Sequence, residues 1–231
     1  MNILIHGTGT MASILSDTIK DGKKHIVSGF ADELTSETGD VIIDFGHFSR
    51  LENLLAFAVE KKIPLLIATT GYSDEILNKI EIASTKIPIL LSSNTSLGIN
   101  LMVKMINSIT NVLYDNFDIE VVEKHHNKKL DSPSGTAKTL VEAIKKQIPY
   151  DIMEEYGREG NKQRAKNEIG IHAIRGGTVV GEHSVFYYGE DEILEIKHTA
   201  LSKKIFTKGA IKSAEILVDK PIGLYHMKDI I

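Results

Sequence analysis

The chain has 231 residues, of which 42% are hydrophobic and 25% charged, with a formal net charge of -4 and no cysteine. This composition suits a globular protein with a buried core and excludes disulfides, thiolate metal sites and cysteine nucleophiles. The sequence has no apolar run of the roughly 20 residues that span a membrane and no signal-peptide pattern, and its mild acidity argues against a nucleic-acid partner. We expect a cytoplasmic protein that binds neither membranes nor nucleic acid.

The first predicted element is a short apolar strand, residues 2–6, which runs into a glycine-containing turn and then a helix through Ile19. The turn reads G-x-G-x-x-A, the dinucleotide-binding fingerprint, in which small residues allow a tight turn, close approach of a pyrophosphate and helix packing. A glycine-rich turn without a ligand is the alternative. We predict that the turn contacts a dinucleotide through Gly7, Thr8, Gly9, Thr10 and Met11.

A second predicted strand, residues 25–31, ends at an acidic residue that can bind the cofactor's ribose. Asp32 follows Gly9 by 23 positions, close to the spacing expected for such an acid. No lysine or arginine directly follows Asp32 to receive a 2′-phosphate, and Glu33 would repel one. We therefore expect NADH to be used at least as well as NADPH.

Apolar strands then alternate with helices, with strands at 41–45, 64–68 and 88–91 and helices at 51–59 and 73–83. This rhythm is typical of a parallel sheet covered on both faces, whose ligands lie at the carboxyl ends of the strands. Each strand end alone is also consistent with an ordinary turn. We predict that the ends of these strands together line the cofactor site. They carry Asp44-Phe45-Gly46 after the first strand, Ala68, Thr69 and Thr70 at the end of the second, and Ser92, Ser93, Asn94 and Thr95 after the third.

Beyond residue 100 the pattern changes to a helix at 101–113, a half-buried strand at 117–123, a helix at 135–147 and strands at 169–174, 178–186 and 193–198. These strands are typical of a mainly antiparallel sheet. We expect an exposed charged loop at 154–168 and a last helix at 206–218. The prediction is an α/β fold with a Rossmann-type dinucleotide-binding domain, 1–96 and 204–231, and an α+β domain for substrate binding and oligomerisation, 97–203.

The most informative segment, residues 123–137, places two histidines, two lysines and a hydroxyl-rich turn before a helix. Histidine is suited to proton transfer near neutral pH, and Lys128 and Lys129 add positive charge and proton donors. Ser132 or Ser134 can cap the helix, whose first amides favour a carboxylate or phosphate. The segment predicts a proton-delivering site for a small dianion.

Three further histidines, His172, His183 and His198, fall on predicted strands or their ends, where we expect structural or subunit-contact roles. Their spacing matches no metal-binding motif, and we predict no metal site.

These motifs resemble those of the dihydrodipicolinate reductase family over essentially the whole chain. The resemblance rests on Glu123-x-His125-His126-x-x-Lys129-x-Asp131-x-Pro-Ser-Gly-Thr136. Supporting motifs are Asp44-Phe45, Arg175-Gly-Gly-Thr-Val-Val-Gly-Glu-His183 and His198-x-Ala-x-Ser202.

The resemblance implies that His125 and Lys129 are catalytic, with Lys129 as the proton donor. It also implies that the substrate's carboxylates are held by His126, Ser134, Gly135 and Thr136. The implied reaction is hydride transfer from NADH or NADPH to a cyclic, unsaturated imine dicarboxylate in lysine biosynthesis. The family also implies a homotetramer.

Two other functions stay open on the residues alone. Another nicotinamide-dependent dehydrogenase, acting on aspartate or an imino acid, would need the glycine turn but not the histidine and lysine segment. A dinucleotide-binding regulator without turnover would be favoured if His125→Gln and Lys129→Ala left the protein's activity in cells unchanged.

Overall fold

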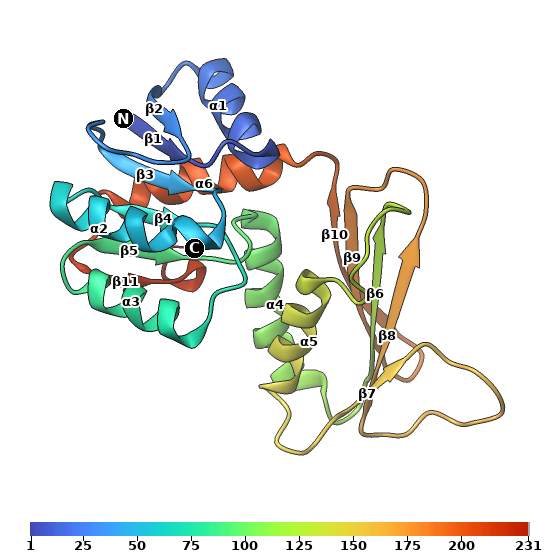
Figure 1. Ribbon diagram of the computed structural model, residues 1–231. Coiled ribbons are helices and arrows are strands. Elements are labelled where there is room, and N and C mark those ends of the chain that lie inside the picture. The colour runs from blue at the N-terminus through green and yellow to red at the C-terminus, as the bar shows by residue number, and fades with distance from the viewer. Residues whose placement is uncertain (231) are drawn as a thin grey trace. The chain divides into compact units, whose positions relative to one another are not determined.

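The computed structural model describes residues 1–230. The chain folds into two compact units, the first formed by Met1–Leu97 with Lys203–Ile231 and the second by Gly98–Ser202. The first unit contains a wholly parallel sheet and the second a mixed sheet (Figure 1). The predicted α/β fold class, with a Rossmann-type parallel sheet, is confirmed.

The first unit alternates strands and helices along the chain. Its strands are β1 (Asn2–His6), β2 (Ile26–Ala31), β3 (Val41–Asp44), β4 (Leu65–Ile67), β5 (Pro88–Leu91) and β11 (Gly223–Tyr225). Its helices are α1 (Thr10–Gly22), α2 (Leu51–Lys61), α3 (Asp74–Ser84) and α6 (Lys204–Leu217), with short 3-10 turns η1 (Phe48–Arg50) and η2 (Met227–Asp229). The strand order is β11-β5-β4-β3-β1-β2.

Two hydrophobic clusters cover the two faces of this sheet. Alternate strand residues such as Leu4 and Ile42 pack with α2 and α3, while their neighbours Ile3 and Ile43 pack with α1 and α6. Because successive side chains of a strand point to opposite faces, strands covered on both sides read as continuous apolar runs. Burying each such side chain contributes about 1.5–3 kcal/mol.

The order of the strands indicates which edge of the first sheet can bind a ligand. The chain passes from β1 to β2 on one side and places β3 on the other side of β1. Such a reversal opens a crevice at the carboxyl ends of the strands, where open α/β sheets bind ligands. The glycine turn follows β1 directly, and Asp32 follows β2.

The second unit places two helices against a five-stranded sheet. Its helices are α4 (Leu97–Leu113) and α5 (Gly135–Lys145), and its strands are β6 (Asp118–His125), β7 (Met153–Tyr156), β8 (Glu168–Arg175), β9 (Gly181–Tyr188) and β10 (Ile193–Ala200). The strand order is β10-β9-β6-β8-β7.

The pairing in this sheet differs in part from the expected antiparallel pattern. β9 is antiparallel to both β6 and β10, but β8 is parallel to β6 and to β7. Parallel neighbours need a long crossover, and the chain between β6 and β8 supplies one that contains α5. The short, charged β7 was not among the predicted strands, because it lies inside a segment poor in apolar residues.

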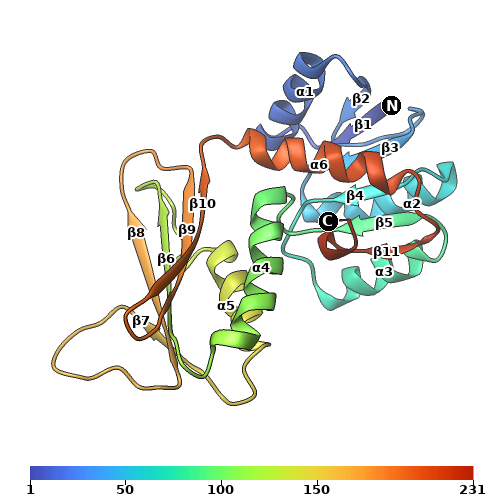
Figure 2. The same ribbon diagram turned by 180° about the vertical axis from the view of Figure 1, so that it is seen from behind.

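Only one face of the second sheet is covered by helices of its own unit (Figure 2). Val121, Val185 and Tyr187 on that face are fully buried against α4 and α5. The charged segment after β7 is tied to the sheet, because Arg158 pairs with Glu120 and Glu168, and Arg164 with Asp118 and Glu120.

Within the described residues, each helix is too short or too polar to cross a membrane.

Candidate active site

The glycine turn after β1 has the backbone geometry that its spacing predicts. Gly7 has a φ of +101°, and a Cβ there would lie 2.6 Å from the Cα of Gly46. Gly9 forms the N-cap of α1 without a side-chain cap, and a Cβ on Gly9 would meet nothing within 4 Å. An uncapped helix start with open space in front of it fits a pyrophosphate.

A buried pair supports this turn from behind. His6 and Asp44 are each 2% exposed, and His6 Nδ1 lies 2.7 Å from Asp44 Oδ1. The same oxygen accepts the Gly46 amide at 2.8 Å. The ends of β1 and β3 are therefore bonded together directly beneath Gly7.

The acid that we predict to bind the ribose, Asp32, has a basic partner that the sequence analysis missed. Asp32 accepts the Thr8 hydroxyl at 2.8 Å and pairs with Arg50 Nη1 at 2.9 Å. The hydrogen bond from Thr8, followed by Arg50, lowers the pKa of Asp32 despite some desolvation. Asp32, Arg50 and Asn53 line a pocket of about 230 Å³.

Arg50 places a positive charge beside Asp32, where the lack of a directly following basic residue led us to expect NADH to be used at least as well as NADPH. It lies in η1, 18 positions after Asp32, and the strand order rather than chain proximity brings the two together. The only sequence signal was a basic residue shortly after the Asp44-Phe45 motif.

The other predicted cofactor residues lie at the ends of β4 and β5. Thr69 donates its hydroxyl to the Gly46 carbonyl at 3.1 Å, whereas Thr95 donates to the Phe206 carbonyl at 2.7 Å and is 2% exposed. Ser92 is also buried. Of the residues after these two strands, Thr70 and Ser93 are exposed, and Ala68 and Asn94 are half-buried. At the start of α1, Thr10 is exposed and Met11 is half-buried.

In the second unit, the predicted catalytic histidine ends β6 and lies on a buried carboxylate. His125 is 9% exposed, and its Nδ1 lies 2.5 Å from Glu123 Oε2. Arg175, at the end of the adjacent β8, donates to both oxygens of Glu123 at 2.8 and 2.7 Å. The parallel register places Arg175 opposite His125.

The helix after this segment is capped by the second of the two candidate serines. Ser134 accepts the Ala137 amide at 3.2 Å, and its own amide donates to Glu123 Oε1 at 3.0 Å. Gly135 is exposed at the first position of α5, and Thr136 is half-buried. The predicted anion-binding helix start is therefore formed.

The predicted proton donor is connected to the same network. Lys129 Nζ lies 2.7 Å from Asp131 Oδ1 and lowers the pKa of Asp131. Arg175 donates to the Asp131 carbonyl at 2.8 Å as well as to Glu123. His126 is half-buried at the start of the turn.

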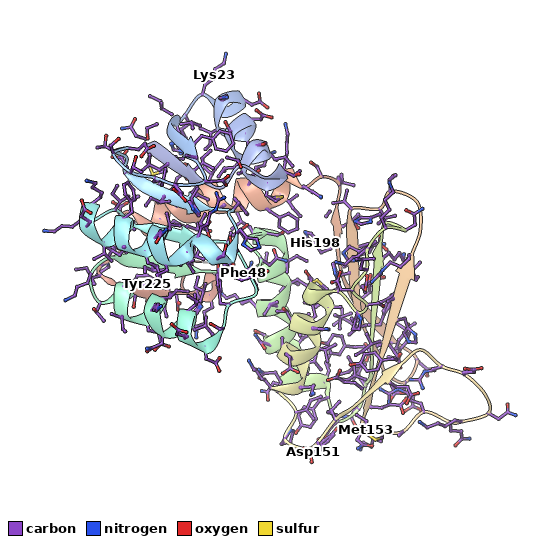
Figure 3. The ribbon with its side chains drawn as sticks, viewed as in Figure 1. Lys23, Phe48, Asp151, Met153, His198 and Tyr225 are labelled. Carbon is purple, nitrogen blue, oxygen red and sulfur yellow. The ribbon has the colours of Figure 1, made fainter. Side chains whose placement is uncertain are left out.

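A third histidine, expected to be structural, joins the site. His183 Nε2 lies 3.0 Å from Ser134 Oγ, and the rings of His183 and His125 meet edge to face at 5.1 Å. Burial, with a smaller contribution from His125, lowers the pKa of His183 to about 4. His198, opposite His183 on β10 (Figure 3), also has its pKa lowered by burial.

Among residues 1–230 no cluster of three or more histidine, aspartate or glutamate side chains is arranged to hold a metal ion.

The family models that match this chain and its most similar relatives indicate the same protein family. The family models described as "Dihydrodipicolinate reductase, N-terminus" and "C-terminus" match residues 23–95 and 98–231. The 4-hydroxy-tetrahydrodipicolinate reductase of Brachyspira hyodysenteriae is 52% identical over the full length of both chains. That of Alkaliphilus oremlandii is 43% identical, covering 100% of this chain and 98% of its own.

Solved structures show the same fold. The dipicolinate-bound dihydrodipicolinate reductase of a Paenisporosarcina species superimposes with a TM-score of 0.82 at 19% identity, covering 100% of this chain and 99% of the other. An amine dehydrogenase of Mycobacterium smegmatis, 10% identical, gives a TM-score of 0.61 and covers 97% and 94% of the two chains. From the family models and the full-length relatives together, the chain belongs to the dihydrodipicolinate reductase family.

Proposed function

We propose that this protein reduces 4-hydroxy-tetrahydrodipicolinate, by way of dihydrodipicolinate, to tetrahydrodipicolinate with NADH or NADPH, as a step of diaminopimelate and lysine biosynthesis. One observation carries the proposal. A single segment, from the end of β6 to the start of α5, holds His125, Lys129 and an anion-binding helix start on one hydrogen-bonded network.

The substrate's two carboxylates need positive or N–H partners. The start of α5 offers Gly135, where a Cβ would meet nothing within 4 Å, and the neighbouring Thr136. Helix starts favour anions through their amides and the helix dipole. We assign these two residues and His126 to the carboxylates.

Reduction of the conjugated imine adds a hydride at one atom and a proton at another. The bound nicotinamide supplies the hydride. We assign the proton to Lys129, whose ammonium is held by Asp131 at 2.7 Å and whose side chain is 21% exposed, so that it is oriented yet accessible. We place His125 beside the reacting ring, with Nδ1 held by Glu123 and Nε2 available for hydrogen bonding.

Both cofactor forms fit the first unit. Asp32 can accept the ribose hydroxyls of NADH, and Arg50, which is 41% exposed, can turn toward the 2′-phosphate of NADPH. We retain the expectation that NADH is used at least as well as NADPH, and we propose that Arg50 allows NADPH to serve as a second cofactor.

We propose a homotetramer assembled through the uncovered face and the free edge of the second sheet. Phe186 and Tyr188 stack on that face, and Ile193, which pairs with Tyr188 on the edge strand β10, is 64% exposed. Large apolar patches of this kind mark protein interfaces. Light scattering at micromolar concentrations should report four chains, and a monomer throughout that range would contradict the assembly. We place the tetramer in the cytoplasm, where reduced nicotinamide cofactors are available.

The test of activity is a coupled assay. The substrate is generated in situ from pyruvate and aspartate semialdehyde by the preceding synthase, and loss of absorbance is followed with NADH and with NADPH. Oxidation that requires the synthase is expected with both cofactors. If folded protein that binds NADH oxidises neither cofactor, the proposal is wrong, and another dehydrogenase or a regulator becomes the better interpretation.

A further inference from the structure

We infer that Glu123 is the positioning residue of the active site, orienting His125 and the anion-binding start of α5 through one buried carboxylate. The inference rests on the proposed function, because it assigns His125 and α5 to the substrate. It adds a role for a side chain that touches neither substrate nor cofactor.

The contacts of Glu123 leave it no capacity for a ligand. Its side chain is fully buried, and its two oxygens accept from two nitrogens of Arg175, from the ring of His125 and from the amide of Ser134, at 2.5–3.0 Å. A carboxylate offers about four acceptor positions, and here all four are used. Glu123 therefore acts only by fixing its neighbours.

The first neighbour is His125. An ionised carboxylate only accepts hydrogen bonds, so His125 Nδ1 must carry the proton in this contact. Nε2 then becomes the ring nitrogen available for other partners, and the bond also fixes the ring plane. His125 Nε2 lies close to Gly181 of β9, because a Cβ added to Gly181 would lie only 3.1 Å from this nitrogen.

The second neighbour is the start of α5. Ser134 gives its amide to Glu123, and its hydroxyl oxygen contacts both the Ala137 amide and His183 Nε2. Ser134 is only 2% exposed. Of the three residues of this turn that the family resemblance assigns to the substrate's carboxylates, Ser134 is therefore turned into the protein, where it holds Gly135 and Thr136 in place.

Arg175 keeps Glu123 charged. Burial alone would raise the pKa of Glu123, but the hydrogen bonds from Arg175, His125 and the Ser134 amide outweigh it and lower the pKa. The bidentate geometry also orients the carboxylate, because the two nitrogens of a guanidinium lie in one plane.

The decisive variant is Glu123→Gln, which preserves size but replaces one acceptor oxygen with an amide donor. That donor must face Arg175, His125 or the Ser134 amide, all of which are donors too. We expect kcat to fall about 100-fold and the KM for substrate to rise, while the Kd for NADH changes by less than about twofold. Binding of dipicolinate, measured by calorimetry, should weaken with the KM.

A merely structural role would not change the protonated nitrogen of His125. ¹⁵N NMR of the histidine rings should show the Nδ1–H form of His125 in the wild type and a mixture or the Nε2–H form in Glu123→Gln. The matched control is Glu182→Gln on the adjacent β9, a carboxylate held by Lys124 and Lys197 away from this network. It should leave kcat, KM and the His125 signal unchanged.

If Glu123→Gln does not fold, Arg175→Lys provides the test, because it keeps the charge and loses the bidentate contact. It should raise KM and lower kcat about tenfold. Folded Glu123→Gln with wild-type kcat, KM and His125 signal would overturn the inference, as would equal losses in Glu182→Gln. Failure of the proposed function can be told apart from failure of this inference. If the proposed function is wrong, the wild-type protein shows no turnover. The NMR and dipicolinate-binding measurements test the role of Glu123 without turnover.

Discussion

The two units prepare their ligand sites in different ways. In the first unit the site is made mainly of backbone, with Gly7 in a positive-φ turn, an uncapped start of α1 and a single exposed ion pair between Asp32 and Arg50. In the second unit the site is made of side chains bonded to one another, with Glu123 fully buried among its donors. We therefore expect the first site to be most sensitive to changes in backbone space, and the second site to be most sensitive to changes in its bonded side chains.

The buried histidine of the second unit, His183, should give the strongest response to a change of conditions. The pKa of His183 is lowered from 6.5 to about 4, so the unfolded chain takes up this proton first as the pH falls. The stabilisation that the folded protein gains from keeping His183 neutral is therefore complete above about pH 6.5 and is lost as the pH falls toward 4. This loss lowers the free energy of unfolding by about 3 kcal/mol.

His183→Asn should flatten the dependence of unfolding free energy on pH across that window, measured by urea denaturation at several pH values. His226→Gln, at an exposed histidine of the first unit, is the control and should keep the wild-type slope. An unchanged slope in His183→Asn would show that His183 is already free to ionise in the folded protein.

The second prediction tests the backbone side. Gly7→Ala would place a Cβ 2.6 Å from the Gly46 Cα at a φ of +101°, so the turn must move. We expect the Kd for NADH to rise about 100-fold, because a shift of about 1 Å misplaces the pyrophosphate. Dipicolinate binding should persist.

The control for Gly7→Ala is Gly22, the last residue of α1, the helix that follows the glycine turn. A Cβ on Gly22 would meet nothing within 4 Å, so Gly22→Ala should leave the Kd for NADH unchanged. Equal NADH affinity in Gly7→Ala and the wild type would remove the glycine turn from the cofactor site.

A smaller effect separates the two cofactors. Asp32→Ala should weaken NADH binding about tenfold, and Arg50→Ala should weaken NADPH binding about tenfold with little change for NADH, as expected for one exposed charged contact each. Fluorescence titration measures the Kd for NADH and the Kd for NADPH in each variant. Lys79→Ala, which removes the surface ion pairs of Lys79 with Glu52 and Glu75 in the first unit, controls for charge. An NADPH affinity unaffected by Arg50→Ala would leave the 2′-phosphate without an assigned partner.

The contrast between the units also explains what could be predicted from the sequence. Gly7, Gly9 and the apolar strands were recognisable because local spacing determines a strand, a turn and a helix start. The sequence limited the N-cap of α5 to Ser132 or Ser134, and in the structure Ser134 caps the helix. These features depend on residues only a few positions apart.

The side-chain network was not predictable in the same way. Glu123 and Arg175 are 52 positions apart, and Ser134 and His183 are 49 apart. Their contacts depend on the register of β6 with β8 and β9, which no local pattern determines. Arg50 was missed for the same reason, since strand order brings it to Asp32. The parallel pairing of β6 with β8 was missed because single strands do not reveal their neighbours.

We propose that the two units divide the reaction, with the first binding the hydride donor and the second delivering the proton. The most direct test of this division is Lys129→Ala, with kcat and the Kd for NADH measured on the same preparation. We expect kcat to fall by about 100-fold or more while the Kd for NADH stays within about twofold of the wild type. An unchanged kcat would show that Lys129 does not donate the proton, and an equal loss of NADH binding would show that the two units do not divide the reaction in this way.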